Sequence, residues 1–279
     1  MIRRLTVRAT ESRIAAKAPG RPALRARRVA FYLTPLLILA AVWQLLSMLG
    51  VLNPKTVPSF FDVVASGVVL SSEGEIFQHL LVSLYRAEVG LLLGAALGVL
   101  LGLAMARIPI MRAAFYPIVS LTYTLPKTAL IPIVLLWLGV GDSSTMFVVF
   151  IGAFVPIVIT TFQGAESVPD AFVWSARSMG SSDTRILWTV VLPAALPQIL
   201  NGVRIAQAFS IVIVVSAEMV AAYVGIGRFI SLFGEAGNYN YMFAAIFFIV
   251  IAAFLLDQLF LAVKGRLLAW AETEGASDA

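Results

Sequence analysis

Six long apolar stretches alternate with more polar segments along the chain, and this pattern predicts six membrane-spanning helices. Each stretch has about 20 or more mostly apolar residues, the length that a helix needs to cross the hydrocarbon core of a bilayer. The predicted spans cover residues 29–49, 81–106, 112–138, 144–163, 194–223 and 241–263. The predicted fold class is therefore an all-α membrane protein with six transmembrane helices.

The spans and the segments between them divide the chain into four predicted regions. Residues 1–28 are predicted to form a basic N-terminal tail, and residues 29–78 the first transmembrane helix with an external loop. Residues 79–265 are predicted to form the main transmembrane domain, and residues 266–279 a C-terminal tail. Inside the external loop, Ser59 followed by Asp62 predicts the start of a helix, because a hydroxyl cap and an early acid both stabilise a helix amino terminus. His79, the only histidine, ends this loop, and we interpret it as structural.

Composition agrees with a membrane protein. The chain is 60% hydrophobic and 13% charged, whereas a soluble domain has about 25% charged residues. The first apolar stretch is long enough to span, so we interpret it as a retained helix and not as a cleaved signal peptide. The chain has no cysteine, which excludes disulfides, thiolate metal sites and cysteine catalysis.

The basic residues are distributed unevenly, and they predict the orientation of the chain. Fifteen of the twenty Lys and Arg residues fall in segments that are cytoplasmic if the amino terminus is inside, nine of them within residues 1–28. Only Lys55 and Arg228 fall in the external segments. Since cytoplasmic loops carry the excess of positive charge, both termini are expected in the cytoplasm. The basic tail is expected to contact the lipid membrane, and nucleic acid is not an expected partner because no folded soluble domain accompanies it.

The second predicted span has a glycine at every fourth position. This spacing places the glycines on one helix face, where a neighbouring backbone can approach closely. We therefore predict tight helix packing at Gly90, Gly94, Gly98 and Gly102.

The third predicted span is interrupted by proline, which kinks or breaks a helix. It contains Pro117, Pro126 and Pro132, with Lys127 and Tyr123 close to the central proline. Such a span either lines a translocation path, through Tyr123, Pro126 and Lys127, or is a bent packing helix. The sequence leaves both roles open.

Charged residues inside the spans are candidates for function because the insertion of each costs at least about 2.5 kcal/mol. Glu218 lies in an otherwise apolar run, and Asp257 lies in the sixth span. We expect Lys127 and Arg204 to be their counter-charges. Glu218 either lines the translocation path or stabilises helix packing through a buried hydrogen bond.

The polar segment 164–193 separates the fourth and fifth spans and predicts two short helices joined by an elbow. Ser167 is the expected cap of the first helix and Ser182 that of the second. Gly180 is expected to end the first helix with a positive φ, because glycine adopts this conformation at the lowest cost. The first helix is expected to carry Phe172, Ala176 and Met179 on one side. A knob of this kind suits a groove on a partner protein or the surface of the lipid.

Motifs of catalysis are missing from the chain. It has no GxSxG, no HExxH and no Gly-rich phosphate-binding loop. We therefore predict no catalytic residue and no metal site. Any nucleotide that powers this protein is expected to bind to another chain.

The polar loop resembles the signature of the permease subunits of binding-protein-dependent ABC importers, in which a short helix, a glycine and a later Leu-Pro occur at fixed spacing. Here nine residues follow Gly180 before Val190–Pro193. Other stretches are similar to the sulfonate, taurine and nitrate subgroup: Leu125–Pro132, Trp137–Gly141, Leu192–Pro197, Ala217–Met219 and Gly225–Gly227. One departure is Trp174, where the family has a glutamate, whereas Ala176 and Arg177 keep the pattern.

The resemblance implies a fold like that of type I ABC importer permeases, in a multi-pass protein of the bacterial inner membrane. It implies that a second permease copy, in a homodimer, completes the path and that a cytoplasmic ATP-binding subunit holds ATP and magnesium. An external solute-binding protein would deliver a sulfonate, taurine, nitrate or a vitamin precursor such as pyrimidine or riboflavin. No cofactor is expected on this chain. The docking residues implied for the ATPase are Phe172, Ser175, Ala176, Arg177, Met179, Gly180, Ser182, Leu192 and Pro193.

Two other classes of protein remain as alternatives. A stand-alone secondary transporter or channel would need its own ion-coupling groups, and the sequence shows few intramembrane acids. A membrane-embedded enzyme would need catalytic groups that the chain lacks. Identification of the proteins that co-purify with the chain separates these classes.

Overall fold

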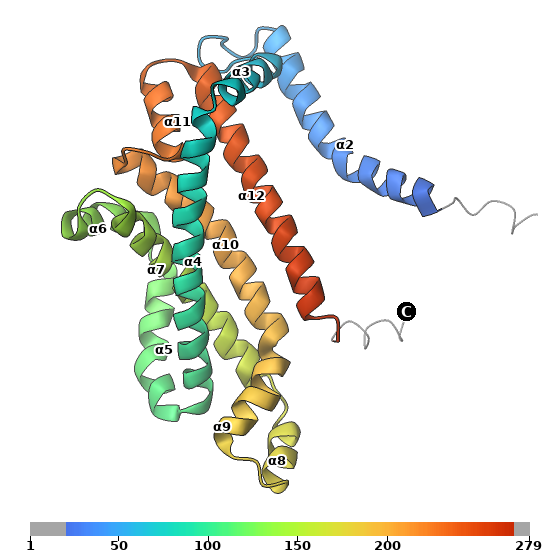
Figure 1. Ribbon diagram of the computed structural model, residues 1–279, viewed down its shortest axis with the longest axis vertical. Coiled ribbons are helices and arrows are strands. Elements are labelled where there is room, and N and C mark those ends of the chain that lie inside the picture. Colours follow the sequence, from blue (N-terminus) through green and yellow to red (C-terminus); the bar gives the residue numbers. More distant parts are fainter. Residues whose placement is uncertain (1–20, 271–279) are drawn as a thin grey trace, which may run out of the picture. The chain divides into compact units, whose positions relative to one another are not determined.

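The computed structural model describes residues 21–270, with side chains from residue 34 onward, and its regular structure in this range is helical (Figure 1). The elements are α2 (Arg21–Met48), α3 (Phe60–Glu73), α4 (Glu75–Arg107), α5 (Pro109–Thr124), η2 (Lys127–Leu130), α6 (Ile131–Leu138), α7 (Asp142–Glu166), α8 (Asp170–Ser178), α9 (Asp183–Ile186), η3 (Leu187–Val191), α10 (Leu192–Ala221), α11 (Ile226–Glu235) and α12 (Tyr239–Leu267). The predicted all-α class is confirmed.

The chain divides after Asp62 into two compact units. The first unit contains α2 and the segment that leads into α3. Trp43 Nε1 donates a hydrogen bond to the Pro58 carbonyl oxygen at 3.1 Å, and the Trp43 ring meets that of Phe60 edge-on. The Ser59 hydroxyl accepts a hydrogen bond from the Asp62 backbone N–H at 3.2 Å, so the helix start predicted there is confirmed.

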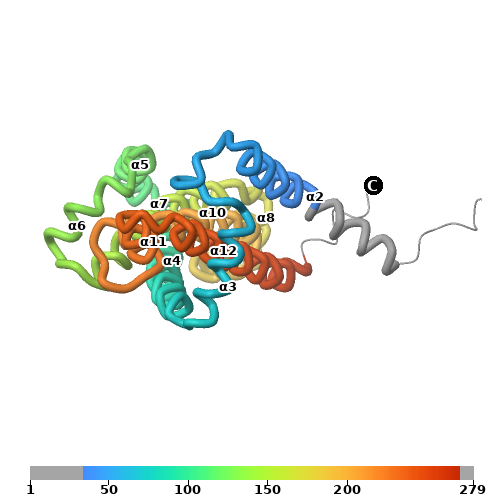
Figure 2. Tube along the Cα trace, turned by 90° about the horizontal axis from the view of Figure 1, so that it is seen from above, coloured from blue at the N-terminus to red at the C-terminus, as the bar shows by residue number. Residues whose placement is uncertain are grey.

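The second unit is built around α4, α7 and α10, which pack against one another along their length. In Figure 2, viewed from above, α6 lies at one end of the second unit, and α12 extends toward the opposite end. α12 contacts α10 and α11, and α5 and α6 contact α7. The three central helices therefore separate α12 from the broken segment α5–α6.

The glycines of α4 face α7 at close range. A Cβ added at Gly102 would lie 2.6 Å from the Cβ of Thr161, and one added at Gly90 would lie 2.7 Å from the Cβ of Val149. Added Cβ atoms at the two glycines between them would also lie about 3 Å or less from α7 atoms, and these are Gly94 and Gly98. Real Cβ atoms do not occupy such positions, so only glycine permits this approach of the two backbones.

Four helical segments of the described range are long and apolar enough to cross a membrane, namely α4, α7, the continuous segment Asp183–Ala221, and α12. The pair formed by α5 and residues 127–138 adds a fifth if the two halves count as one span. Of the predicted first span, the described side chains begin at Thr34, and Thr34–Met48 is a shorter apolar helix. The described part of the chain therefore has four or five candidate spans, against the six predicted.

The third predicted span, 112–138, is broken and not merely kinked. Its two halves meet at 96°. The reason that the helix is interrupted is local, because Leu125 precedes a proline and adopts the extended conformation with a ψ of 136°, as residues before proline tend to do. Pro126 then lacks the N–H that would continue the helix.

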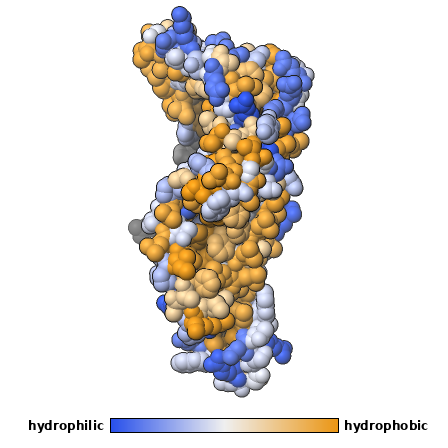
Figure 3. Space-filling model, turned by 90° about the vertical axis from the view of Figure 1, so that its left-hand side faces the viewer, coloured by the Kyte–Doolittle hydropathy of each residue, from blue (hydrophilic) through white to orange (hydrophobic). Residues whose placement is uncertain are grey.

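The surface has the hydropathy pattern of a membrane protein. Figure 3 shows hydrophobic residues covering much of the middle of one face, and hydrophilic residues at the end that carries α8 and α9. The most apolar span, α12, is also the least buried, with 11% of its most apolar window inside the protein. Hydrocarbon can cover such side chains, so their exposure is expected in a bilayer.

Candidate functional site

The loop between α7 and α10 forms a two-helix knob at one end of the second unit, at the bottom of Figure 1. Its first helix, α8, and the residue that follows it expose three large side chains: Phe172 at 60%, Trp174 at 64% and Met179 at 79%. Trp188 adds a further exposed ring after α9. Large apolar side chains gathered on a protruding knob are typical of a surface that a partner covers.

The elbow between α8 and α9 is a Schellman motif centred on Gly180. Gly180 has a φ of +80°, as the sequence predicted. Its N–H donates to the Arg177 carbonyl oxygen at 2.9 Å, and the Ser181 N–H donates to the Ala176 carbonyl oxygen at 3.1 Å. These two bonds satisfy carbonyl groups that the helix end would leave free. No atom lies within 4 Å of a Cβ added at Gly180, so the requirement for glycine is conformational and not steric.

Side-chain interactions cap the second helix and join it to the first. The Ser182 hydroxyl accepts a hydrogen bond from the Arg185 backbone N–H, so the predicted cap is confirmed. Arg177 and Asp183 form an ion pair of 2.6 Å across the elbow. A turn of π-helix then follows at residues 187–191, a feature often found at functional sites, and the sequence did not predict it.

Two predictions for this loop are wrong. Ser167 does not cap α8, because its hydroxyl donates instead to the Gly164 carbonyl oxygen at 2.8 Å and it follows the end of α7, while Pro169 immediately precedes α8. Ala176 does not share the exposed surface of Phe172 and Met179. It is 6% exposed, because its short side chain lies in the core beneath them.

The base of the knob belongs to the hydrophobic core. Val173 and Ala176 from α8 and Ile186 from α9 pack in one buried cluster with residues of the long helices. The other members of the cluster are Leu103, Ala165, Val168, Val191, Ala195 and Ile199. Leu192 and Pro193, at the start of α10, are half-buried. The knob therefore shares one close-packed core with α7 and α10.

A cavity of about 390 Å³ opens where the broken segment α5–α6 meets α7 and α10. Its lining consists of Tyr123, Leu125, Pro126, Lys127, Thr128, Gly152, Pro156, Phe209, Val212 and Ile213. The Lys127 ammonium donates to the Tyr123 carbonyl oxygen and lies 5.3 Å from the centre of the Tyr123 ring. Three of the four residues predicted for the translocation path, Tyr123, Pro126 and Lys127, therefore line one cavity, whereas Glu218 does not.

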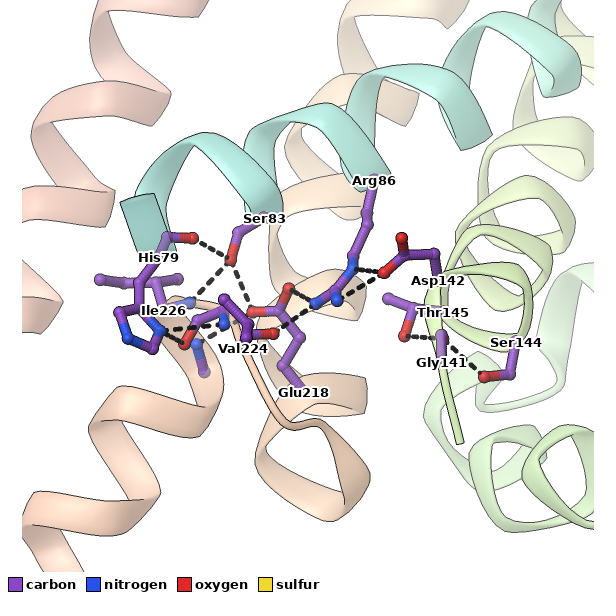
Figure 4. A network of polar contacts seen from close by, with 12 residues as sticks. His79, Ser83, Arg86, Gly141, Asp142, Ser144, Thr145, Glu218, Val224 and Ile226 are labelled. Atoms are coloured by element: carbon purple, nitrogen blue, oxygen red, sulfur yellow. Dashed lines mark hydrogen bonds and ion pairs between the residues drawn. The ribbon is translucent and has the colours of Figure 1, made fainter. Parts of the chain in front are cut away.

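Glu218 lies in a separate, buried ionic network (Figure 4). Its side chain is fully buried, and its carboxylate accepts hydrogen bonds from Arg86 at 2.7 Å, Ser83 at 2.6 Å and the Gly227 N–H at 3.0 Å. Arg86 also donates to Asp142 at 2.6 and 2.8 Å. The network joins α4, α7 and α10 to the start of α11.

The counter-charge predicted for Glu218 is wrong, since Arg86 takes the place that Lys127 was expected to fill. Arg86 itself is 5% exposed. The pairing predicted between Arg204 and Asp257 is confirmed, with two hydrogen bonds of 2.7 and 2.9 Å.

The single histidine, His79, lies beside the Glu218 network (Figure 4). The Gly225 N–H donates to His79 Nδ1 at 3.0 Å, and the Ser83 hydroxyl accepts from the Ile226 N–H at 2.7 Å. Gly225 has a φ of +138°, and a Cβ there would lie 2.3 Å from the Glu218 carboxyl carbon. His79 and Ser83 therefore fix the turn before α11, and the backbone of that turn closes over Glu218.

Comparison with known proteins identifies the family of this helical bundle. Residues 94–268 match the family described as the binding-protein-dependent transport system inner membrane component, and the chain belongs to this family. The taurine transport system permease protein TauC of Escherichia coli (strain K12) is 30% identical over 249 residues, which cover 88% of this chain and 90% of that protein. The nitrate import permease protein NrtB of Synechococcus elongatus is also 30% identical over 249 residues, covering 85% and 88%.

Solved structures show the same fold. A chain of the inward-facing MetNI methionine ABC transporter matches with a TM-score of 0.56 and 22% identity, covering 67% of this chain and 93% of that chain. A chain of an amino acid ABC transporter matches with a TM-score of 0.55 and 14% identity, covering 71% and 94%. The predicted type I importer fold and the sulfonate, taurine and nitrate type of family are confirmed.

Proposed function

We propose that this chain is the membrane-spanning subunit of an ATP-driven importer for a small anionic solute. The observation that carries the proposal is the knob of α8 and α9, which exposes apolar side chains outward and packs its base into the core of the spans. A surface of this kind suits a groove on a cytoplasmic ATPase. The ATPase would bind ATP and magnesium, and this chain would supply the path.

The docking surface would consist of the exposed residues of the knob. Phe172, Trp174 and Met179 are the large apolar contacts, and Ser175, Arg177 and Ser182 are exposed polar residues around them. Trp174 would replace the charged contact of the family's glutamate with an apolar one. Tyr and Trp supply large contact areas at interfaces, so the groove that receives this chain should be apolar at that point.

Movement of the knob would drive the path between two states. ATP binding would draw the two ATPase subunits together, and with them the knobs of two permease copies. Since α8 and α9 share a core cluster with residues of α7 and α10, the long helices would follow as packed bodies and not bend locally. The cavity at Lys127, which is walled by the same two helices, would change its access in consequence.

The relatives support a proposal for the solute and the remaining partners. Their names assign taurine to one and nitrate to another, and we propose a solute of this anionic class, a sulfonate included. An external solute-binding protein would deliver it, and a second copy of this chain would complete the path in the inner membrane. Both termini would lie in the cytoplasm.

Purification of the tagged chain from membranes of its own host tests this function. The preparation should contain a nucleotide-binding subunit and hydrolyse ATP, whereas the chain produced alone should hydrolyse none. Hydrolysis by the chain alone would contradict the proposal. Solute uptake into vesicles that contain only this chain, without ATP, would instead support a secondary transporter.

A further inference from the structure

Lys127 differs from two other cations of the spans, Arg86 and Arg204, because it has no acidic partner. Arg86 and Arg204 both form ion pairs with carboxylates. Among residues 34–270, whose side chains are described, no carboxylate forms an ion pair with Lys127. Ionisable residues inside a membrane pair with one another or face a water-filled cavity. Lys127 belongs to the second class, since it lines the cavity of about 390 Å³ between the broken segment, α7 and α10.

Lys127 lies beside the middle of α7. A Cβ added at Gly152 would lie 3.9 Å from Lys127 Cγ, so the two residues are neighbours. Gly152 is ten residues from the start of α7 at Asp142, or about 15 Å along the axis at 1.5 Å per residue. Counted from Asp142 as the point where α7 enters the bilayer, this distance is about half of the hydrocarbon core, which is about 30 Å thick. The break at Pro126 places irregular backbone and a polar side chain at this level. Irregular backbone at membrane depth is tolerated only where it lines a cavity or meets protein.

The chemistry of the cavity is that of a site for one negative charge with a small apolar tail. The walls are mostly apolar, with Phe209, Val212 and Ile213 from α10. Lys127 is the only charged residue of the lining. An ammonium has three N–H donors, and the Tyr123 carbonyl oxygen is the acceptor that the structure places on them. Donors therefore remain for a ligand.

We propose that the Lys127 cavity is an anion-binding subsite of the translocation path, where the ammonium holds a small monovalent oxyanion, such as a sulfonate or nitrate group, during passage. The inference rests on the proposed importer function and deepens it by naming the side chain that selects for charge. Lys127 compensates the charge of the anion at the depth where hydration is lost. Apolar walls then accept the short organic part of a sulfonate without demanding specific contacts.

Charge-selective labelling of a single thiol tests this subsite without knowledge of the solute. The chain has no cysteine, so Thr128→Cys places one thiol of this chain on the cavity wall. The purified complex is treated with sulfonatoethyl methanethiosulfonate, an anion, or with trimethylammonioethyl methanethiosulfonate, a cation, and labelling of this chain is followed by its mass. The ratio of the anionic to the cationic rate should fall about tenfold or more when Lys127→Met is added, because both rates depend on a charge a few ångströms away. Lys127→Arg should keep the ratio.

A second readout and a matched control separate binding from general electrostatics. Sodium ethanesulfonate should slow labelling of Thr128→Cys by the neutral methyl methanethiosulfonate, and it should lose this effect with Lys127→Met. Ser72→Cys, an exposed position at the end of α3, is the control. Lys127→Met should change neither the ratio of the anionic to the cationic labelling rate at this thiol nor its labelling rate in the presence of ethanesulfonate. Three outcomes would each overturn the subsite. They are a rate ratio at Thr128→Cys that does not change with Lys127→Met, no labelling of Thr128→Cys by any reagent, and no protection by ethanesulfonate. None of these outcomes depends on ATP hydrolysis, so a failure here is distinct from a failure of the importer function.

Discussion

Arg86 and Glu218, 132 positions apart in the chain, form an ion pair of 2.7 Å that is almost completely buried. The same guanidinium donates to the Val224 carbonyl oxygen at 2.6 Å and to Asp142. One side chain of α4 thus ties α10, the turn before α11 and the first turn of α7 together (Figure 4). The pair is a structural joint near one end of the three central helices, and it lies outside the Lys127 cavity.

Removing the arginine should therefore destabilise the protein strongly. Arg86→Met leaves the fully buried Glu218 without its charged partner, and loss of one partner of a buried pair costs about 3–5 kcal/mol. Glu218→Gln should cost less, because Arg86 keeps Asp142 and the Val224 carbonyl oxygen, and because an amide oxygen can still accept a hydrogen bond. Thermal unfolding in detergent measures both.

The exposed pair in the knob is the matched control for the buried one. Arg177 and Asp183 are 59% and 82% exposed, and exposed pairs contribute at most about 1 kcal/mol. Arg177→Met should therefore shift the unfolding temperature far less than Arg86→Met. Equal shifts for the two variants would show that the Arg86 network is not the structural joint described.

The glycine face of α4 makes a second prediction. Gly102→Ala should destabilise the protein by about 1–3 kcal/mol, the usual cost of overpacking, because the new Cβ would lie 2.6 Å from the Thr161 Cβ and 2.8 Å from the Val158 carbonyl oxygen. Gly265→Ala in α12 is the control. A Cβ there meets no atom within 4 Å, so its effect should be neutral or slightly stabilising through helix propensity. A neutral Gly102→Ala would mean that α4 and α7 are not packed this closely.

The charge asymmetry predicts the topology, with the knob on the cytoplasmic side. In intact cells, an impermeant thiol reagent should label Ser72→Cys, at the end of α3, and should leave Ser181→Cys, in the elbow, unlabelled. Permeabilisation of the cells should make Ser181→Cys reactive, which shows that the thiol is available. Labelling of Ser181→Cys from outside would reverse the orientation and remove the docking surface from the ATPase.

Local chemistry made much of this structure predictable. Apolar segment length gives the long helices, and the requirement of glycine for positive φ gives the elbow at Gly180. Pro126 predicts an interruption, but the 96° angle depends on how both halves pack. The sequence could not predict that Glu218 pairs with Arg86. Arg86 and Lys127 are both distant from Glu218 in the chain, and either cation could satisfy its buried carboxylate. Only the tertiary fold decides between them. Ala176 was misplaced for a related reason, since helical spacing gives the side of a helix but not the depth of a small side chain.

The most direct test of the central claim, that the knob couples this chain to an ATPase, is the replacement of Gly180. Gly180→Val places a β-branched residue at a φ of +80°, which costs about 1 kcal/mol or more and changes the direction in which α9 leaves α8. Three six-histidine-tagged proteins are purified from host membranes at equal abundance: the wild type, Gly180→Val and the neighbouring control Ser181→Ala. For each, the ATPase activity that co-purifies is measured, and so is ATP-dependent solute uptake in proteoliposomes. Gly180→Val should insert normally and lose co-purified ATPase activity and uptake together, whereas Ser181→Ala should keep both. A Gly180→Val protein that retains its ATPase and transports at the wild-type rate would contradict the role of the knob as the coupling element.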